Sequence, residues 1–418
     1  MNYITLVMVG LTVLPILFGA LLGLLRGSRR ALLRLILIVV CVAVAFALTG
    51  VVTKAVMNMQ IEAIGGTVID YLKQVLLGNL PESMAEFAIP IAQSILQVVI
   101  FLLLFSVLLL LTWAIVYPLC KLFVKKGKRP HRVIGLVIGA VQGVVVALVV
   151  CVIMTGLIVQ ANNVMVASSD LNQIIGGVET QSAEGDNASN VPAEEDNSMD
   201  LVMGILSEYS DSGLAKMYNA IGAKPFALIS QVKLEDGSKI TFPGQVEAVC
   251  GLVDMAKELT ELQGVQYDKL LTKDNIDKLE IIFGRLDEIK DGLSDEARTT
   301  VNKLMTTLSN EMGLANFNGI NLMDINFQKE GEIFTRLYQY NEKDVSELTV
   351  DDAKSILHDI AQSDLILDML QQKDGVNLSS QLNADEHQEI INGILEEMEA
   401  DDEISQEKID ALRQIFGV

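Results

Sequence analysis

The chain has 418 residues, half of them hydrophobic, with a mean hydropathy of +0.40 and a formal net charge of −22 at pH 7. Residues 1–160 carry 12 Lys or Arg against four acidic residues, and the rest of the chain carries 19 against 49. Two parts of opposite charge sign are typical of separate domains. The acidic part excludes nucleic acid as a partner, because a phosphate backbone requires a basic surface.

Four long segments of the first part are almost free of charge. A helix needs about 20 apolar residues to cross the hydrocarbon core of a bilayer. The sequence therefore predicts a membrane domain over 1–165, embedded in the lipid bilayer by four transmembrane helices, at about residues 2–25, 35–53, 91–118 and 133–159.

Basic residues concentrate in the two loops 26–34 and 119–132. Lys and Arg close to the ends of a span remain in the cytoplasm. We therefore expect both loops to be cytoplasmic, and the N-terminus and the acidic C-terminal domain to be extracytoplasmic. The loop 54–88 has apolar residues at helical spacing, which fits either a segment on or partly in the membrane or a plain exterior loop with one helix.

Two expected spans carry glycines at strict four-residue spacing: Gly19, Gly23 and Gly27 in the first, and Gly135, Gly139 and Gly143 in the fourth. Each trio lies on one face of its helix and allows another backbone to approach closely. The pattern indicates helix packing, either within the chain or in a homo-oligomer, and a lined pathway is the alternative. Arg26 and Arg132 flank the two stripes, where their side chains can extend to the lipid phosphates.

Three glutamines are the main polar residues expected within the membrane: Gln142 in the fourth span, and Gln93 and Gln97 on one face of the third. We expect them to form hydrogen bonds between helices. No Asp, Glu, Lys or His lies in the middle of a span, which argues against a proton- or ion-coupled transporter.

The first part resembles the colicin V production protein (CvpA) family of bacterial membrane proteins. The resemblance rests on Gly19-Ala-Leu-Leu-Gly23-Leu-Leu-Arg26-Gly27, on Arg132-Val-Ile-Gly135-Leu-Val-Ile-Gly139-Ala-Val-Gln-Gly143 and on the four-span layout, and it covers about residues 1–165. It implies a protein of the bacterial cytoplasmic membrane with a role in envelope homeostasis or in toxin production and export. The acidic residue that the family usually has early in its first span is missing, and Asn2 and Thr5 occupy that region.

The second part begins with an acidic, flexible linker over 166–199, which is rich in Ser, Asn and Gly. Beyond it, 200–418 is expected to form a soluble helical domain, because aliphatic residues recur there at three- and four-residue spacing. Thr349 with Asp352 and Asn383 with Glu386 match capping boxes, and Ser294 precedes another helix. Alternation around Asp236-Gly237 predicts one β-hairpin over 232–242, with Leu234 opposite Ile240 and Val232 opposite Phe242.

Some relatives in the family that the first part resembles carry a serine protease domain, which would imply catalysis by the second part. Asp211-Ser212-Gly213 is similar to a protease nucleophile region, but such proteases need an upstream His, and the only one is His131 on the expected cytoplasmic side. The acidic run Asp401, Asp402 and Glu403 lacks the glycine and the spacing of a calcium loop. We therefore expect no enzyme activity, no cofactor and no metal.

The sequence as a whole favours a non-enzymatic membrane protein of the envelope, whose external helical domain binds a protein partner or another envelope component. A channel or export component built on the glycine stripes is the first alternative. A membrane-anchored enzyme with an unrecognised site is the second, and a deep pocket with converging polar groups in the soluble domain would favour it.

Overall fold

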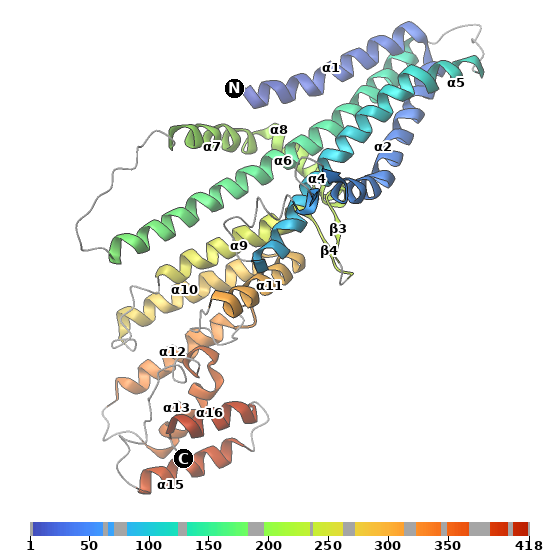
Figure 1. The fold of residues 1–418 in the computed structure, drawn as a ribbon. Helices are drawn as coiled ribbons and strands as arrows, with labels where there is room; N and C mark the ends of the chain where they lie inside the picture. The colour runs from blue at the N-terminus through green and yellow to red at the C-terminus, as the bar shows by residue number, and fades with distance from the viewer. Residues whose placement is uncertain are drawn as a thin grey trace. The chain divides into compact units, whose positions relative to one another are not determined.

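The computed structural model describes residues 3–61, 66–70, 82–123, 132–182, 196–234, 237–261, 272–312, 323–343, 349–367, 385–399 and 404–416. Figure 1 shows that the described elements are helices, apart from two short hairpins, which confirms the all-α class. The chain divides into two compact units, unit 1 over Met1–Cys250 and unit 2 over Gly251–Val418.

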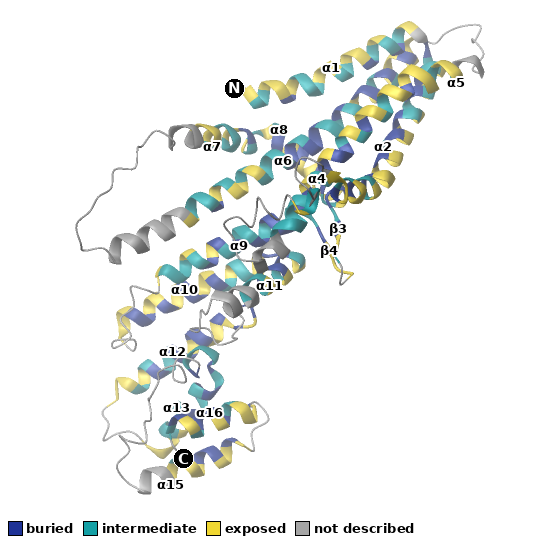
Figure 2. Ribbon diagram, viewed as in Figure 1, coloured by how far each residue is buried: buried dark blue, intermediate teal, exposed yellow. Residues whose placement is uncertain are grey.

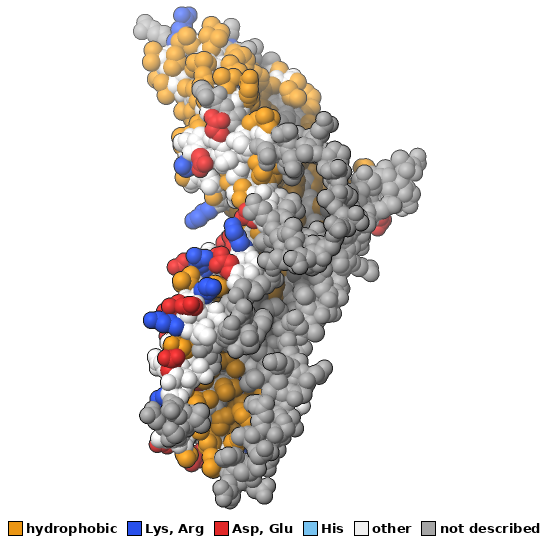
Figure 3. Space-filling view, turned by 90° about the vertical axis from the view of Figure 1, so that its left-hand side faces the viewer, with side chains coloured by type: hydrophobic (Ala, Val, Ile, Leu, Met, Phe, Trp, Pro, Cys, Tyr) orange, Lys and Arg blue, Asp and Glu red, His pale blue; other side chains and the backbone are white. Residues whose placement is uncertain are grey.

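Unit 1 contains the four expected membrane-spanning candidates, whose apolar stretches cover Tyr3–Leu25, Ser28–Met57, Ala88–Cys120 and Arg132–Leu171. They belong to α1 (Tyr3–Arg26), α2 (Ser28–Met57), α4 (Glu82–Leu111) and α6 (Arg132–Ser182), and α4 continues through the π-helical turn η1 (Thr112–Val116) into α5 (Tyr117–Phe123). Large apolar side chains such as Leu14, Leu103 and Leu110 are exposed on their outer faces. Figure 3 shows such side chains gathered over one end of unit 1, a surface that suits lipid rather than water.

The expected loop 26–34 is helical except at Gly27, which alone joins α1 to α2 with φ at 81°. Glycine adopts this left-handed conformation at no steric cost, so the chain can reverse without a longer loop. Arg29, Arg30 and Arg34 consequently lie in the first turns of α2. In Figure 1 this turn lies at the same end of the bundle as α5 and the start of α6.

The fourth span differs from the expected length. Helix α6 has 51 residues and ends at Ser182, which corresponds to about 76 Å at 1.5 Å per residue, well beyond a hydrocarbon core of about 30 Å. The predicted linker 166–199 is therefore helical over its first part, while 183–195 lies outside the described residues. Extending an existing helix needs no new nucleation, so Ser- and Asn-containing turns can continue from a stable span.

The expected domain boundary at residue 200 also differs from the observed division. Helices α7 (Asp196–Ser210) and α8 (Gly213–Ile229) pack on the spans, and one stripe of α8 shares a core with membrane residues (Figure 2). From α7 and α8 this core includes Tyr209, Ala215, Tyr218, Phe226 and Ile229, and from the spans it includes Met8, Cys41, Phe101, Phe105, Cys151 and Val152. The physical reason is burial, because the apolar stripe of α8 finds its partner surface on α6.

The predicted hairpin is present with a different register. β3 (Val232–Lys233) pairs antiparallel with β4 (Lys239–Ile240), and Val232 lies opposite Ile240 rather than opposite Phe242. Leu234 N donates to the carbonyl oxygen of Ser238 at 2.9 Å, so the turn lies one residue earlier than predicted. Phe242 instead begins α9, where its side chain is buried against Phe226.

The segment between α2 and α4 contains a second, unpredicted hairpin, in which β1 (Gln60–Ile61) pairs with β2 (Gly66–Thr67). Thr67 N donates to Asp70 at 2.9 Å just after it. Residues 71–81, which contain most of the apolar positions behind the two expected forms of the loop 54–88, lie outside the described residues.

Unit 2 is built from the amphipathic helices that the aliphatic spacing predicts. α9 (Phe242–Glu261) leads into it from unit 1, and it continues with α10 (Lys273–Gly292), α11 (Asp295–Met312), α12 (Phe327–Asn341), α13 (Val350–Gln362), α15 (Asp385–Met398) and α16 (Gln406–Phe416). Phe283 packs on Phe327 and Phe334, both with ring centroids 5.9 Å away. A second cluster joins α13, α15 and α16 through residues such as Leu357, Leu395 and Leu412.

Helix starts in unit 2 follow local signals. The Thr349 and Asp352 capping box is formed, and Ser294 Oγ accepts a hydrogen bond from Ala297 N at 3.3 Å. Asn326 caps α12 by accepting from Lys329 N at 2.9 Å. The other predicted box involves Asn383, which lies outside the described residues, as do Asp401, Asp402 and Glu403.

Candidate functional site

The two glycine stripes face each other along the contact between α1 and α6. A Cβ atom built at Gly19 would lie 3.0 Å from Gly143 N and closer still to the backbone of Gly139. A Cβ at Gly23 would lie 3.0 Å from Gly139 Cα and would also meet the carbonyl of Gly135. Real Cβ contacts are almost never this short, so only glycine allows the two backbones to pack at this separation.

The same contact extends to both ends of the stripes. A Cβ at Gly135 would meet the backbone of Gly23 and Gly27, and one at Gly143 would meet Pro15 and Ile16. All six glycines are buried within the chain. The structure thus brings together every glycine that the sequence singles out.

The flanking arginines differ in what the structure describes. Arg132 begins α6 and is exposed, whereas the side chain of Arg26 lies outside the described residues. Near this end, Gln142 Nε2 of α6 donates a hydrogen bond to the carbonyl oxygen of Ala31 in α2. Gln142 is 5% exposed, so this bond links two helices in an apolar setting.

Gln97 of α4 forms hydrogen bonds with the end of α8 rather than with another span. Its Nε2 donates to the carbonyl oxygens of Ile229 at 2.9 Å and Gln231 at 3.0 Å. Ile229 is the last residue of α8 and Gln231 lies just beyond it, where a helix leaves carbonyl acceptors without helical partners. Gln93 is half-buried one turn away, and its side chain forms no hydrogen bond with another residue that the structure describes.

Two buried tyrosines attach α7 and α8 to the spans. Tyr218 Oη lies 2.7 Å from Thr12 Oγ1 in α1, and Tyr209 Oη lies 2.7 Å from Thr155 Oγ1 in α6. Because the Thr12 hydroxyl donates to the Met8 carbonyl at 2.7 Å, Tyr218 acts as the donor to Thr12. Burial raises the pKa of both tyrosine hydroxyls, which therefore stay neutral.

Close packing at two glycines also holds α8 against α6 without polar groups. A Cβ at Gly222 would lie 2.7 Å from Val152 Cγ2, and one at Gly156 would lie 2.7 Å from the ring of Phe226. Sequence reasoning missed these positions. The sequence offered no signal for them, because 213–229 also carries Lys216 and Lys224 and its apolar stripe matches that of a soluble helix.

The serine of the protease-like tripeptide has a structural partner. Ser212 is the N-cap of α8, and its Oγ accepts a hydrogen bond from Ala215 N at 3.2 Å. Among the described residues no group of three or more His, Cys, Asp or Glu side chains is arranged to hold a metal ion.

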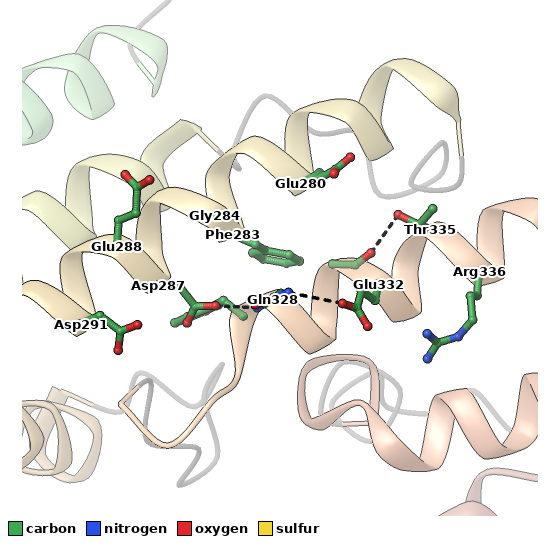
Figure 4. Close-up of a pocket in the computed structure, with 12 residues that line it drawn as sticks. Glu280, Phe283, Gly284, Asp287, Glu288, Asp291, Gln328, Glu332, Thr335 and Arg336 are labelled. Carbon is green, nitrogen blue, oxygen red and sulfur yellow. Dashed lines mark hydrogen bonds between the residues drawn. The ribbon is translucent and has the colours of Figure 1, made fainter.

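Unit 2 carries an open hollow of about 970 Å³ between α10 and α12. Buried Phe283 and Phe327 lie at its base. Figure 4 shows carboxylates around Phe283, with Arg336 at one end. The acidic residues of the lining are Glu280, Asp287, Glu288, Asp291 and Glu332. Asp287 accepts from Gln328 N at 2.6 Å, which fixes the start of α12 against α10.

The hollow combines an aromatic base with a rim of five carboxylates, of which Asp287 pairs with Lys290 at 3.4 Å and Asp291 pairs with Arg298 at 3.6 Å. Such a surface can hold an extended or helical peptide segment that carries both apolar and basic side chains. Arg336 is held by a bidentate interaction with buried Asp359, with Nη2 2.7 Å from Oδ1 and Nε 3.1 Å from Oδ2. This pairing orients the cation at the edge of the acidic surface.

Comparison with known proteins gives no relative. No protein-family model matches the chain, and neither a curated protein nor a solved structure matches it.

Proposed function

We propose that this chain is a non-enzymatic protein of the bacterial cytoplasmic membrane that anchors an acidic, helical interaction module outside the cytoplasm. Its role would lie in envelope homeostasis or in the production and export of a peptide toxin, as the resemblance to the CvpA family implies. The observation that carries the proposal is the hollow of unit 2, with Phe283 and Phe327 at its base and acidic side chains around it. The partner would be a basic, partly apolar segment of an envelope protein.

The geometry of the spans supports an anchor in preference to a channel. A pathway or subunit contact built on the glycine stripes needs those faces to be free. In this chain Gly19, Gly23 and Gly139 are covered by the backbone of the facing helix. A channel would therefore have to use another surface, and no Asp, Glu, Lys or His lies in the middle of a span to serve it.

The test uses a full-length chain without its four native cysteines and with a single Cys in place of Gln328, which is exposed at the hollow. Intact cells are treated with a photo-crosslinker that reacts with thiols and does not cross membranes. We expect a discrete crosslinked product, and we expect Asp291→Lys with Glu288→Lys to abolish it because both changes reverse charge at the rim.

Two control positions make the outcomes separable. A Cys at exposed Glu407 of α16 should react with the reagent in intact cells but give no product. A Cys at exposed Arg29 should react only after lysis. Reaction at Gln328 only after lysis would place unit 2 in the cytoplasm, and reaction without a product would contradict the partner-binding role.

A further inference from the structure

Arg34 of α2 is a buried cation at the basic end of unit 1. Its residue surface is 4% exposed. The guanidinium carbon lies 4.2 Å from the ring centroid of Tyr117 and 5.3 Å from that of Trp113, so two aromatic faces contact it. We call these three residues the arginine cage.

The cage has an unused hydrogen-bond donor. Arg34 Nη2 is buried and has no hydrogen-bond partner among the residues that the structure describes. Leaving a buried charged donor unpaired is costly, since both desolvation and the missing bond oppose it. Cation–π contact offsets only a part of this cost. The arrangement is therefore incomplete without an anionic acceptor.

The surrounding sequence cannot supply that anion as a side chain. No Asp or Glu occurs between residues 1 and 61 or between 87 and 169, the ranges that contain α1, α2, α5 and the membrane-spanning part of α6. The four acidic residues of the first 160 all fall within 62–86, between α2 and the apolar part of α4. The acceptor must come from outside the membrane helices.

The position of the cage indicates where the anion lies. Side chains of a helix lean toward its N-terminus, so the guanidinium of Arg34 points toward the end where α2 begins. That end carries the exposed Arg29 and Arg132. Aromatic residues such as Trp113 and Tyr117 favour the headgroup level of a bilayer. The phosphates of the adjoining leaflet lie at this level.

The two aromatic residues of the cage lie in the π-helical turn and at its end. Tyr117 N donates to the Thr112 carbonyl across five residues, which adds a residue to the turn. Trp113 and Tyr117, four residues apart, both contact Arg34. Trp113 is also stacked on Phe18 at 6.1 Å and remains 39% exposed, so it forms the outward face of the cage.

We propose that the arginine cage binds a phosphate group, and that this phosphate belongs to an anionic phospholipid of the adjoining leaflet. The planar guanidinium donates to phosphate oxygens in the way that arginine favours. Trp113 and Tyr117 hold the guanidinium in place and pack against the glycerol region. This site is independent of the partner proposed for unit 2.

The test uses the purified full-length chain in a neutral detergent, with phosphatidylglycerol or phosphatidylcholine added. Native mass spectrometry measures bound lipid, and the unfolding midpoint measures stabilisation. We expect phosphatidylglycerol to bind and raise the midpoint, and Arg34→Gln to weaken its binding about tenfold or more, as for loss of a charge-assisted hydrogen bond. Without anionic lipid, Arg34→Gln should unfold at the same temperature or higher.

Arg29→Gln is the matched control, because it removes one positive charge from the same end of the same helix outside the cage. It should keep phosphatidylglycerol binding within about twofold, as expected for an exposed charge. An equal loss of phosphatidylglycerol binding in both variants would overturn the site and indicate nonspecific electrostatic attraction instead. Equal binding of phosphatidylcholine would overturn it as well.

Two further arms complete the test. Tyr117→Leu keeps the positive charge of Arg34 but removes one aromatic face of the cage, and it keeps the test decisive if Arg34→Gln does not fold. It should also weaken phosphatidylglycerol binding. Unchanged binding would overturn the cage. Inorganic phosphate alone should produce no shift. A full shift with inorganic phosphate would support a phosphate site but overturn its assignment to lipid.

Discussion

Gly23 lies where α1 crosses α6, and backbone atoms of Gly135 and Gly139 surround the space that a side chain would need. No flexible side chain is available there to move aside. Any substitution must therefore separate two helix backbones, which removes van der Waals contacts along the whole glycine stripe.

We expect Gly23→Ala to destabilise unit 1 by about 1–3 kcal/mol, the usual cost of overpacking a tight contact. The measurement is the unfolding midpoint of the purified chain in detergent. Gly50→Ala in α2 is the matched control, because a Cβ there meets nothing within 4 Å. That variant should unfold at the same temperature or slightly higher, since alanine favours a helix. Equal effects of both changes would contradict backbone packing as the cause.

Glu330 is a second constrained residue, in unit 2. It is 2% exposed, and its carboxylate accepts hydrogen bonds from Ser363 Oγ and from Asp364 N, the latter at 2.9 Å. Burial, together with the nearby Asp364 carboxylate, raises the pKa of Glu330 above its ordinary value of 4.5, although these hydrogen bonds act in the opposite direction.

The raised pKa predicts a pH dependence of unit 2. The folded state binds the Glu330 proton more tightly than the unfolded state, so its contribution to stability is complete below the ordinary pKa of 4.5 and is lost as pH rises through the folded pKa. Glu330→Gln should therefore match the wild type at low pH and become relatively more stable as pH rises. Calorimetry of the unit 2 transition tests this. Glu332→Gln, at an exposed position of the same helix, should leave the pH profile unchanged.

At the scale of elements, α7 and α8 behave as a layer of unit 1. Their docking depends on one buried stripe of α8 and on the hydroxyl contacts of Tyr218 with Thr12 and Tyr209 with Thr155. The outer face of the layer exposes Leu201, Met217, Ile221 and Leu228. An apolar outer face beside the spans is typical of a helix pair in contact with the membrane interface.

Removing the hydroxyl contacts should loosen this layer alone. We expect Tyr218→Phe combined with Tyr209→Phe to cost about 1 kcal/mol per hydrogen bond. Hydrogen–deuterium exchange should therefore speed up in peptides of α7 and α8 and stay unchanged in α10 and α12. Tyr3→Phe, at a residue that is 84% exposed, provides the control. Faster exchange throughout unit 2 would contradict the assignment of α7 and α8 to unit 1.

At the scale of the molecule, the chain joins a lipid-facing helical bundle to an acidic helical unit. The first contributes rigid backbone packing through glycine, and the second contributes a hollow with an aromatic base and a negative rim. The proposed function uses both units, since the bundle fixes the module to a membrane and the module presents the binding surface.

Properties that reside in one segment were predictable from the sequence. Four spans follow from uninterrupted apolar runs, and the helices of unit 2 follow from aliphatic spacing and caps such as Thr349. Glycines at positions 19, 23, 135 and 139 were also visible as packing surfaces. These features depend on local hydropathy and backbone propensity, which neighbouring residues alone determine.

Contacts between distant segments were decided only by the tertiary structure. The stripe of Tyr218 and Phe226 looks the same whether it covers α6 or another soluble helix, so the sequence could not assign α8 to unit 1. Nor could spacing reveal that Gln97 binds the end of α8 or that Tyr117 covers Arg34. Each of these contacts joins residues far apart in the chain, and local patterns carry no information about which surfaces meet.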